Sequence, residues 1–226
     1  GIFGKVIQVE NSGTRIVSLE KEELIQRLGV VPLPPYIKKT VPNSERYQTV
    51  YSRIEGSVAS PTAGLHFTEN LLRRLRSKGA ETVFVTLHVG WDSFNPVKTE
   101  DPSHHPMHSE YWEISDKAAE VIRSAKTEGR KIISVGTTAA RLLENAAQVQ
   151  KSPLLDSGSG WADIFICPGY SFRVLDNLIT NFHLPKSTLM MLTSALAGTD
   201  LILKAYEEAI RLRYRFYSFG DAMFII

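Results

Sequence analysis

Two short runs with the apolar residues of strands open the chain. Residues 2–10 and 14–19 lie on either side of the turn sequence Asn11-Ser12-Gly13, and this pattern predicts a β-hairpin. A two-stranded hairpin is only marginally stable by itself, so further strands are expected beside it. Lys21 to Gly29 follows with apolar residues at helical spacing and a glycine at its end, which predicts a short helix.

A proline-rich stretch, Val31 to Tyr36, separates this beginning from the rest of the sequence. Each proline restricts the residue before it and lacks a backbone donor, so the stretch is expected to be extended. We therefore predict that residues 1–35 form the remnant of a small β lobe with its linker. The main domain is then expected in residues 36–226.

Beyond residue 57, apolar runs typical of buried strands alternate with amphipathic segments typical of helices. The expected strands are residues 82–89, 131–135, 162–166 and 175–180, and the expected helices are residues 69–78, 117–128, 139–150, 185–196 and about 199–214. Residues 151–160 are rich in Ser and Gly and predict a flexible loop. The alternation indicates an α/β fold, with a mostly parallel or mixed sheet and flanking helices.

Four polar turns lie where such a fold gathers its ligand loops, at the ends of strands and the beginnings of helices. They span residues 60–68, 87–94, 136–141 and 180–187. Each has an ordinary structural explanation, because a Gly-Thr-Thr turn commonly starts a helix and a single histidine commonly makes a structural hydrogen bond. Their number and placement predict that the four turns come together around one ligand.

Composition narrows the class of protein without identifying a function. The chain has 226 residues, 43% of them hydrophobic, and a net charge of +2, which excludes a disordered or collagen-like chain. The single Cys167 excludes an intramolecular disulfide and a cysteine-rich zinc site. No apolar run reaches the roughly 18 residues of a membrane span, and the first residues lack a signal-peptide core. A cytoplasmic protein with no membrane partner is therefore expected.

Histidines and basic residues leave two further alternatives open. His105 and His108 have the spacing of a metal-ligand pair, but His-Glu-x-x-His, Gly-x-Ser-x-Gly and phosphate-binding glycine motifs are absent from the sequence. A histidine-based metal hydrolase therefore stays a lesser alternative. Basic residues concentrate on two expected helices, at Arg73, Arg74, Arg76 and Lys78 and at Arg211, Arg213 and Arg215. These clusters fit either solvated helix faces or contacts to RNA phosphates.

Several long strings in the second part of the chain carry a family resemblance. They are Pro32–Ile37, Arg46–Tyr51, Pro61–Thr68, Leu87–Gly90 with Phe94 and Pro96-Val97, His105–Glu110, Val135–Thr138, Asp163–Ile166, Thr180–Leu189, Arg213–Phe216 and Gly220–Met223. In this order, the strings resemble the S-adenosylmethionine:tRNA ribosyltransferase-isomerases of queuosine biosynthesis. The resemblance runs from about residue 32 to the end of the chain.

This resemblance implies a specific reaction. The ribosyl moiety of S-adenosylmethionine is transferred to the 7-aminomethyl-7-deazaguanine base of tRNA and isomerised, which yields epoxyqueuosine-tRNA and releases adenine and methionine. No cofactor or metal is implied, since S-adenosylmethionine is a co-substrate, and a monomer is favoured. The implied fold is an α/β domain with a small β-barrel-like lobe, which is incomplete in this chain. The alternative is a non-catalytic fragment that binds S-adenosylmethionine or RNA.

The implied chemistry selects candidate catalytic residues. A base must remove a proton from the carbon beside the sulfonium, a donor must assist the departure of adenine, and water must be excluded. Histidine suits both proton transfers near neutral pH, so His66, His88 and His183 are the expected catalytic residues, without assignment of base and acid.

Polar residues in and near the same turns are expected to bind the substrates. The expected substrate contacts are Thr62, Gly64, Gly90, Gly136, Thr137, Thr138, Arg141, Asp163, Asn181 and Asp221. The helix start at Thr137 and Thr138 suits a carboxylate or ribose, and Arg141 suits the methionine carboxylate. Asp163 and Asp221 are expected near the sulfonium or ribose, or else in turns. The residues expected to face RNA, by phosphate pairing or base stacking, are Arg46, Tyr47 and Lys186.

Overall fold

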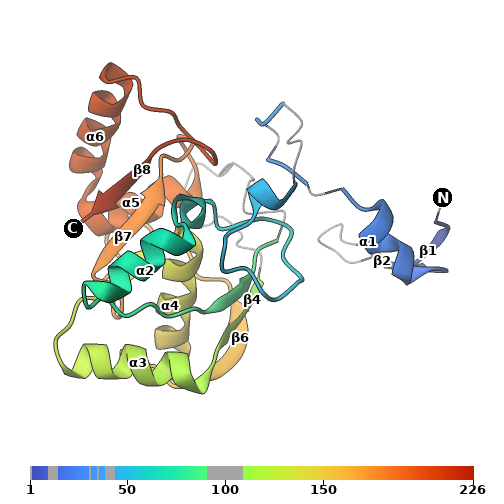
Figure 1. Cartoon of the computed structure of the whole chain (residues 1–226), viewed down its shortest axis with the longest axis horizontal. Coiled ribbons are helices and arrows are strands. Elements are labelled where there is room, and N and C mark those ends of the chain that lie inside the picture. Colours follow the sequence, from blue (N-terminus) through green and yellow to red (C-terminus); the bar gives the residue numbers. More distant parts are fainter. Residues whose placement is uncertain (1, 10–14, 31, 35, 39–43, 91–108) are drawn as a thin grey trace. The chain divides into compact units, whose positions relative to one another are not determined.

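The chain divides into two compact units, Gly1–Leu33 and Pro34–Ile226, close to the boundary predicted after residue 35. The computed structural model describes residues 2–9, 15–30, 32–34, 36–38, 44–90 and 109–226 (Figure 1). Each unit is described by itself.

The first unit contains the predicted hairpin. Strands β1 (Gly4–Val9) and β2 (Arg15–Leu19) pair antiparallel, and a short helical segment follows as η1 (Glu22–Leu24) and α1 (Ile25–Leu28). The strand residues are largely exposed on both faces, including apolar Ile7 and Val9. The predicted barrel-like lobe is not confirmed, because the described residues of this unit form a two-stranded sheet.

The second unit carries two three-stranded sheets. In the first, β3 (Thr86–His88), β4 (Glu110–Ile114) and β6 (Gly158–Ala162) are antiparallel in the order β3-β4-β6. In the second, β5 (Ile133–Val135) pairs parallel with β7 (Asn177–Asn181), which pairs antiparallel with β8 (Ala222–Ile225). The mixed α/β class is confirmed, whereas the mostly parallel alternative is wrong, since β5–β7 is the one parallel pair among the described strands.

Helices of this unit begin largely where the sequence predicts. They are η2 (Ser44–Tyr47), η3 (Thr62–His66), α2 (Glu69–Ser77), α3 (Asp116–Thr127), α4 (Thr137–Gln150), α5 (Thr188–Ala197) and α6 (Thr199–Arg211). Thr68 and Ser187 cap α2 and α5 by accepting hydrogen bonds from the backbone N–H of Leu71 and Met190. In Figure 1, α3 and α6 lie at opposite ends of the unit. No single helix in the described part of the chain is long and apolar enough to cross a membrane; α5 and α6 satisfy that test only as a pair bent by 112°.

Two strands, β4 and β8, were not predicted, and β6 occupies part of the predicted flexible loop. In β6, Gly160 lies against the ring of Trp112, and a Cβ atom there would come within 3.0 Å of the indole. One of the glycines that suggested a loop, Gly160, therefore serves packing against a neighbouring strand. The strand predicted over residues 82–89 is limited to β3.

Helix α4 is the centre of the unit. Leu142 and Ala146 pack with Trp112 and Ile114 of β4, and Ala140 packs with Leu178 of β7. Glu144, which is fully buried, accepts hydrogen bonds from the backbone N–H groups of residues 173–175 at 2.8–2.9 Å. Because buried groups on several sides of α4 are satisfied in this way, the beginning of the helix is held in a defined place.

Candidate active site

A cavity of about 270 Å³ opens near the first turn of α4. Its lining residues come from all four predicted turns, namely Ser60–Ala63, Val89, Gly136–Thr138 with Arg141, and Thr180–Pro185 with Ser187. Tyr36, Ala59, Glu110, Leu189, Tyr217 and Ser218 complete the lining. The prediction that these turns come together around one space is therefore confirmed for their described residues, and residues 91–94 of the second turn lie outside those residues.

Strand pairing explains this convergence. Because β5 and β7 are parallel neighbours, their carboxyl ends reach the same edge of the sheet, and the turns at residues 136–141 and 180–187 meet there. The N–H of Gly136 donates to the carbonyl of Ile179 at 2.8 Å and ties the two turns together. In the antiparallel pair, the end of β3 meets the start of β4, so Val89 lies beside Glu110 at the cavity.

The first turn of α4 lies at the cavity, and its first N–H groups have no partner within the helix. Gly136 adopts φ +91°, which a side chain would disfavour, and the helix begins directly after it without a side-chain cap. Thr137 and Thr138, the first helical residues, line the cavity. The free N–H groups and the helix dipole together favour an anionic group of a ligand at this position.

Arg141 and Glu110 form a buried ion pair in the cavity wall. The Nη1 of Arg141 donates to Oε2 of Glu110 at 2.6 Å, and the two side chains are 7% and 4% exposed. The Oε1 atom of Glu110 accepts from the N–H of Gly90 at 3.2 Å. The buried Nε and Nη2 atoms of Arg141 have no hydrogen-bond partner in the described part of the protein. One edge of the guanidinium is therefore held by protein, and the other is buried without a partner in the described part of the chain.

Glu110 was not among the residues predicted for the site, although the pattern of β4 carries a signal for it. Glu110, Trp112 and Ile114 alternate with more exposed residues and share the buried face of the strand. A carboxylate in such an apolar row is costly unless it is paired, so it predicts a buried cationic partner.

His183 lines the cavity as a neutral imidazole. Its Nε2 lies 2.7 Å from Oγ1 of Thr180, and its backbone N–H donates to the hydroxyl of Tyr206 at 2.6 Å. Burial lowers the pKa of His183 from 6.5 to about 4, because the charged ring would lose its hydration. At neutral pH the ring therefore carries no charge and retains a nitrogen able to accept a proton.

Asn181 connects the cavity to His66 at its margin. The hydroxyl of Thr62 donates to Oδ1 of Asn181 at 3.2 Å, which directs the amide nitrogen toward Nε2 of His66 at 3.3 Å. An amide nitrogen only donates, so Nε2 of His66 is the acceptor and is unprotonated in this arrangement. His66 is exposed and does not line the cavity.

Tyr36 and Ser218 bring two hydroxyl groups to the cavity that the sequence did not predict for the site. Their oxygens lie 2.6 Å apart, and both residues line the cavity. Burial raises the pKa of Tyr36, so its hydroxyl stays protonated and can donate a hydrogen bond. The two residues lie far apart in the sequence, which is why spacing alone did not link them.

Three further predicted site residues, besides His66, lie away from the cavity lining. His88 stacks on Tyr111 with ring centres 5.8 Å apart, Asp163 is exposed, and Asp221 pairs with Arg215 at 2.8 Å. Hydrogen bonds from Arg215 hold the pKa of Asp221 below its usual range and close the loop before β8. The cavity lining therefore gives no support to a catalytic role for His88 or to direct substrate contacts of the two aspartates.

Two glycines predicted to contact substrate have structural roles instead. Gly64 is buried in η3, where an added Cβ would lie 2.0 Å from the hydroxyl of Tyr51. Gly90 is absent from the cavity lining and acts through its N–H, which holds Glu110.

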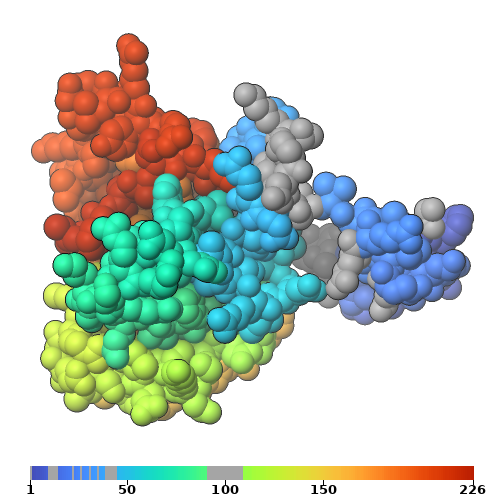
Figure 2. Space-filling view, in the orientation of Figure 1, coloured from blue at the N-terminus to red at the C-terminus, as the bar shows by residue number. Residues whose placement is uncertain are grey.

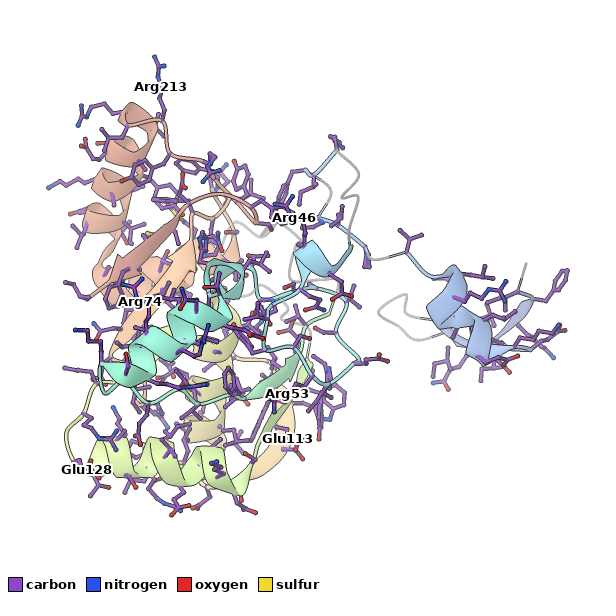
Figure 3. All side chains as sticks on the ribbon, viewed as in Figure 1. Arg46, Arg53, Arg74, Glu113, Glu128 and Arg213 are labelled. Carbon is purple, nitrogen blue, oxygen red and sulfur yellow. The ribbon has the colours of Figure 1, made fainter. Side chains whose placement is uncertain are left out.

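Of the residues expected to face RNA, two are exposed and one is not. Arg46 on η2 and Lys186 before α5 are exposed, and Figure 3 shows Arg46 projecting from its short helix. Tyr47 is only 1% exposed and packs on Phe219 with ring centres 5.7 Å apart, and burial raises its pKa to about 12. The prediction that Tyr47 stacks on RNA is wrong, because its ring is enclosed by protein.

No group of three His, Cys, Asp or Glu side chains able to hold a metal ion occurs among the residues that the structure describes. His105 and His108, the proposed ligand pair, lie outside those residues.

Comparisons with known proteins are consistent in what they identify. The family described as "Queuosine biosynthesis protein" matches residues 2–225. S-adenosylmethionine:tRNA ribosyltransferase-isomerases of Clostridioides difficile and Acetivibrio thermocellus are 52% and 54% identical over 99% and 98% of this chain. The crystal structure of an S-adenosylmethionine tRNA ribosyltransferase from Thermotoga maritima matches 99% of this chain with a TM-score of 0.60 and 32% identity.

This chain is shorter than those proteins. It spans 66% and 65% of the length of the two curated relatives and covers 61% of the chain in the crystal structure.

Proposed function

This chain belongs to the queuosine biosynthesis protein family, and from that premise we propose that it transfers and isomerises the ribosyl moiety of S-adenosylmethionine onto the 7-aminomethyl-7-deazaguanine base of tRNA. Adenine and methionine are the leaving products, and epoxyqueuosine-tRNA is formed. The activity of its relatives from Clostridioides difficile and Acetivibrio thermocellus, as their names describe it, supports this proposal. The observation that carries it is the cavity where four separate turns join a buried arginine, a neutral histidine and a free helix start.

The cavity suits the demands of this chemistry. Its volume is near the lower end of small-molecule pockets, and its lining combines apolar groups with a few directed polar groups. The buried part of the lining keeps water from one side of a rearranging sugar and strengthens the electrostatic contacts made there. S-adenosylmethionine enters as a co-substrate, so the proposed reaction uses no separate cofactor.

His183 is our candidate for the base. The carbon beside a sulfonium is acidified by the adjacent positive charge, and a neutral imidazole can accept its proton without first losing one. The pKa of about 4 keeps His183 in this form throughout the neutral range. Thr180 fixes the ring by its contact to Nε2.

His66 is the second candidate for proton transfer, at the margin of the same cavity. Asn181, which lines the cavity, reaches its ring, and the unprotonated Nε2 in this arrangement can take up a proton. Tyr36 is a further hydroxyl donor that can stabilise departing adenine or the ribose oxygens.

RNA is proposed to approach over basic surface. The exposed candidates are Arg46, Lys186 and the basic residues of α2, whose surface is seen in Figure 2 and whose Arg74 is labelled in Figure 3. Such contacts fix the position of a phosphate backbone without reading its sequence. A monomer acting in the cytoplasm, where tRNA is modified, remains our expectation.

The test is release of adenine. The chain is incubated with S-adenosylmethionine and tRNA that carries the precursor base, and free adenine is measured by chromatography. We expect one adenine per modified base, and none with the same tRNA carrying ordinary guanine. Absence of adenine would overturn the proposal, and binding of S-adenosylmethionine without adenine release would identify the chain as a binding fragment.

A further inference from the structure

We propose that Glu110 is a positioning residue that turns the free edge of Arg141 toward the cavity, where it binds the α-carboxylate of S-adenosylmethionine. This inference rests on the proposed function and specifies how one end of the co-substrate is held. Arg141 is the binding residue, and Glu110 acts through it.

The guanidinium of Arg141 is divided between protein and cavity. Its Nη1 is held by Glu110 at 2.6 Å, whereas Nε and Nη2 lie on the other edge and have no partner in the described chain. These two nitrogens are arranged as a fork, which matches the two oxygens of a carboxylate. Both nitrogens are buried, so this edge of the guanidinium lacks protein partners as well as bulk water, and pairing with a ligand oxygen would satisfy it.

The start of α4 provides a second attraction for the same anion. Thr137 and Thr138 lie about one helical turn before Arg141, and all three residues line the cavity. The positive end of the helix dipole adds to the guanidinium charge, while Glu110 neutralises part of it. Because Glu110 already pairs with the guanidinium, an anionic ligand is expected to bind only when it contacts both the helix start and the free edge of Arg141.

Glu110 is well placed to fix this geometry. It lies on β4, and its second oxygen accepts from the N–H of Gly90 at 3.2 Å, so the carboxylate is oriented from the β3 side as well. A long arginine side chain loses considerable rotamer freedom when it is held in one orientation. Because Glu110 already holds Arg141 in one orientation, this freedom is lost before the ligand binds. Such preorganisation favours binding.

The burial of the site favours a small-molecule carboxylate over an RNA phosphate. A backbone phosphate is flanked by a sugar on each side and needs an open surface, whereas a carboxylate ends a flexible chain and can enter a closed pocket. Arg141 belongs to the buried wall, and the exposed arginines of α2 are more accessible to a polynucleotide.

The experiment removes the carboxylate from the ligand. Binding of S-adenosylmethionine and of decarboxylated S-adenosylmethionine, which retains the sulfonium, adenosine and amine, is measured by calorimetric titration of the whole chain. We expect the unaltered chain to bind the decarboxylated ligand about 10- to 100-fold more weakly. This arm needs no substitution, so it does not depend on the folding of a variant.

Variants then assign the effect to residues. Arg141→Gln is expected to bring the ratio of the affinity for S-adenosylmethionine to that for the decarboxylated ligand close to one. Glu110→Ala is expected to lower this ratio below about threefold, because the free edge of Arg141 is no longer held. Glu110→Gln keeps an oxygen that accepts from Nη1 and should retain most of the ratio. Glu113→Ala is the matched control, because Glu113 lies on the same strand but is exposed (Figure 3). It should leave the ratio unchanged.

Each result decides between the inference and the proposed function. Equal binding of both ligands to the unaltered chain would overturn the carboxylate site while leaving the proposed function in place, and binding of neither would remove both. A normal ratio in Glu110→Ala would overturn the positioning role. Loss of tRNA affinity in Arg141→Gln, with the ligand ratio unchanged, would show that the arginine binds phosphate instead.

Discussion

The parallel pair β5–β7 and the antiparallel pair β3–β4 both border the cavity, but they supply it very differently. The parallel pair brings two turns to one edge, with Thr137 and Arg141 after β5 and Asn181 and His183 at the end of β7. From the antiparallel pair, by contrast, the cavity receives Val89 and Glu110.

The difference follows from the geometry of strands and turns. Successive side chains of a strand point to opposite faces, so His88 and Val89 cannot both reach the same space. Val89 faces the cavity, and His88 lies on Tyr111 instead. A turn that continues into a helix start is free of this alternation and can direct several neighbouring polar groups into the same space.

Replacement of His183 and of His88 would test the difference between the two strand pairs, and it is expected to give the largest change in activity. His183→Ala is expected to reduce adenine release about 10²- to 10⁴-fold, since it removes the proposed base. His88→Ala should reduce it less than about tenfold, because the ring lies outside the cavity lining. Initial rates of adenine release would check both, with circular dichroism to confirm folding. A larger loss for His88 would reverse the comparison.

Loss of the buried ion pair should cost the most stability. Arg141→Ala leaves Glu110 buried without its cation and is expected to destabilise the chain by about 3–5 kcal/mol. Arg215→Ala breaks an ion pair whose arginine side chain is 76% exposed, and should cost far less stability, because solvent screens an exposed pair. Urea denaturation of both variants gives the two values. Equal costs would mean that Glu110 finds another partner when Arg141 is absent.

The dependence of stability on pH should report the environment of His183. Its folded pKa of about 4 lies below the ordinary value of 6.5, so between these values the unfolded chain binds the extra proton. Stability is therefore expected to fall as the pH decreases through this window, by up to about 1.4 kcal/mol per pH unit from this residue.

His183→Asn should remove this part of the pH dependence. Urea unfolding at about pH 7 and about pH 5, for the unaltered chain and the variant, measures the difference. An unchanged pH dependence in the variant would show that His183 is not held in its neutral form by burial.

Substitution of one glycine in each of the two turns is expected to give the smallest change in stability. Gly136→Ala places a side chain at φ +91° and is expected to cost about 1–2 kcal/mol, although the space is open enough, with Ala63 at 3.7 Å. Gly90→Ala at the end of β3 meets nothing within 4 Å and keeps the N–H that holds Glu110, so its cost should be close to zero. Thermal unfolding midpoints would compare the two variants, and similar shifts would remove the distinction between the turns.

Local features of the fold were predictable because they depend on neighbouring residues. The capping side chains Thr68 and Ser187 and the starts of α2 and α5 follow from short-range hydrogen bonds. Strand β6 was mistaken for a loop because its Gly160 accommodates Trp112, which lies on another strand. No local pattern carries that information.

The amino-acid sequence by itself determined the hairpin, most of the helices, the polar character of the four turns and membership of the family, since these depend on local periodicity and on strings of residues. Tertiary structure alone decided which of those polar residues meet. It enclosed Tyr47, turned His88 away from the cavity, and joined Glu110 to Arg141 across β4 and α4. The physical reason is that burial and pairing are properties of contacts between distant segments, and strand register and helix packing set those contacts.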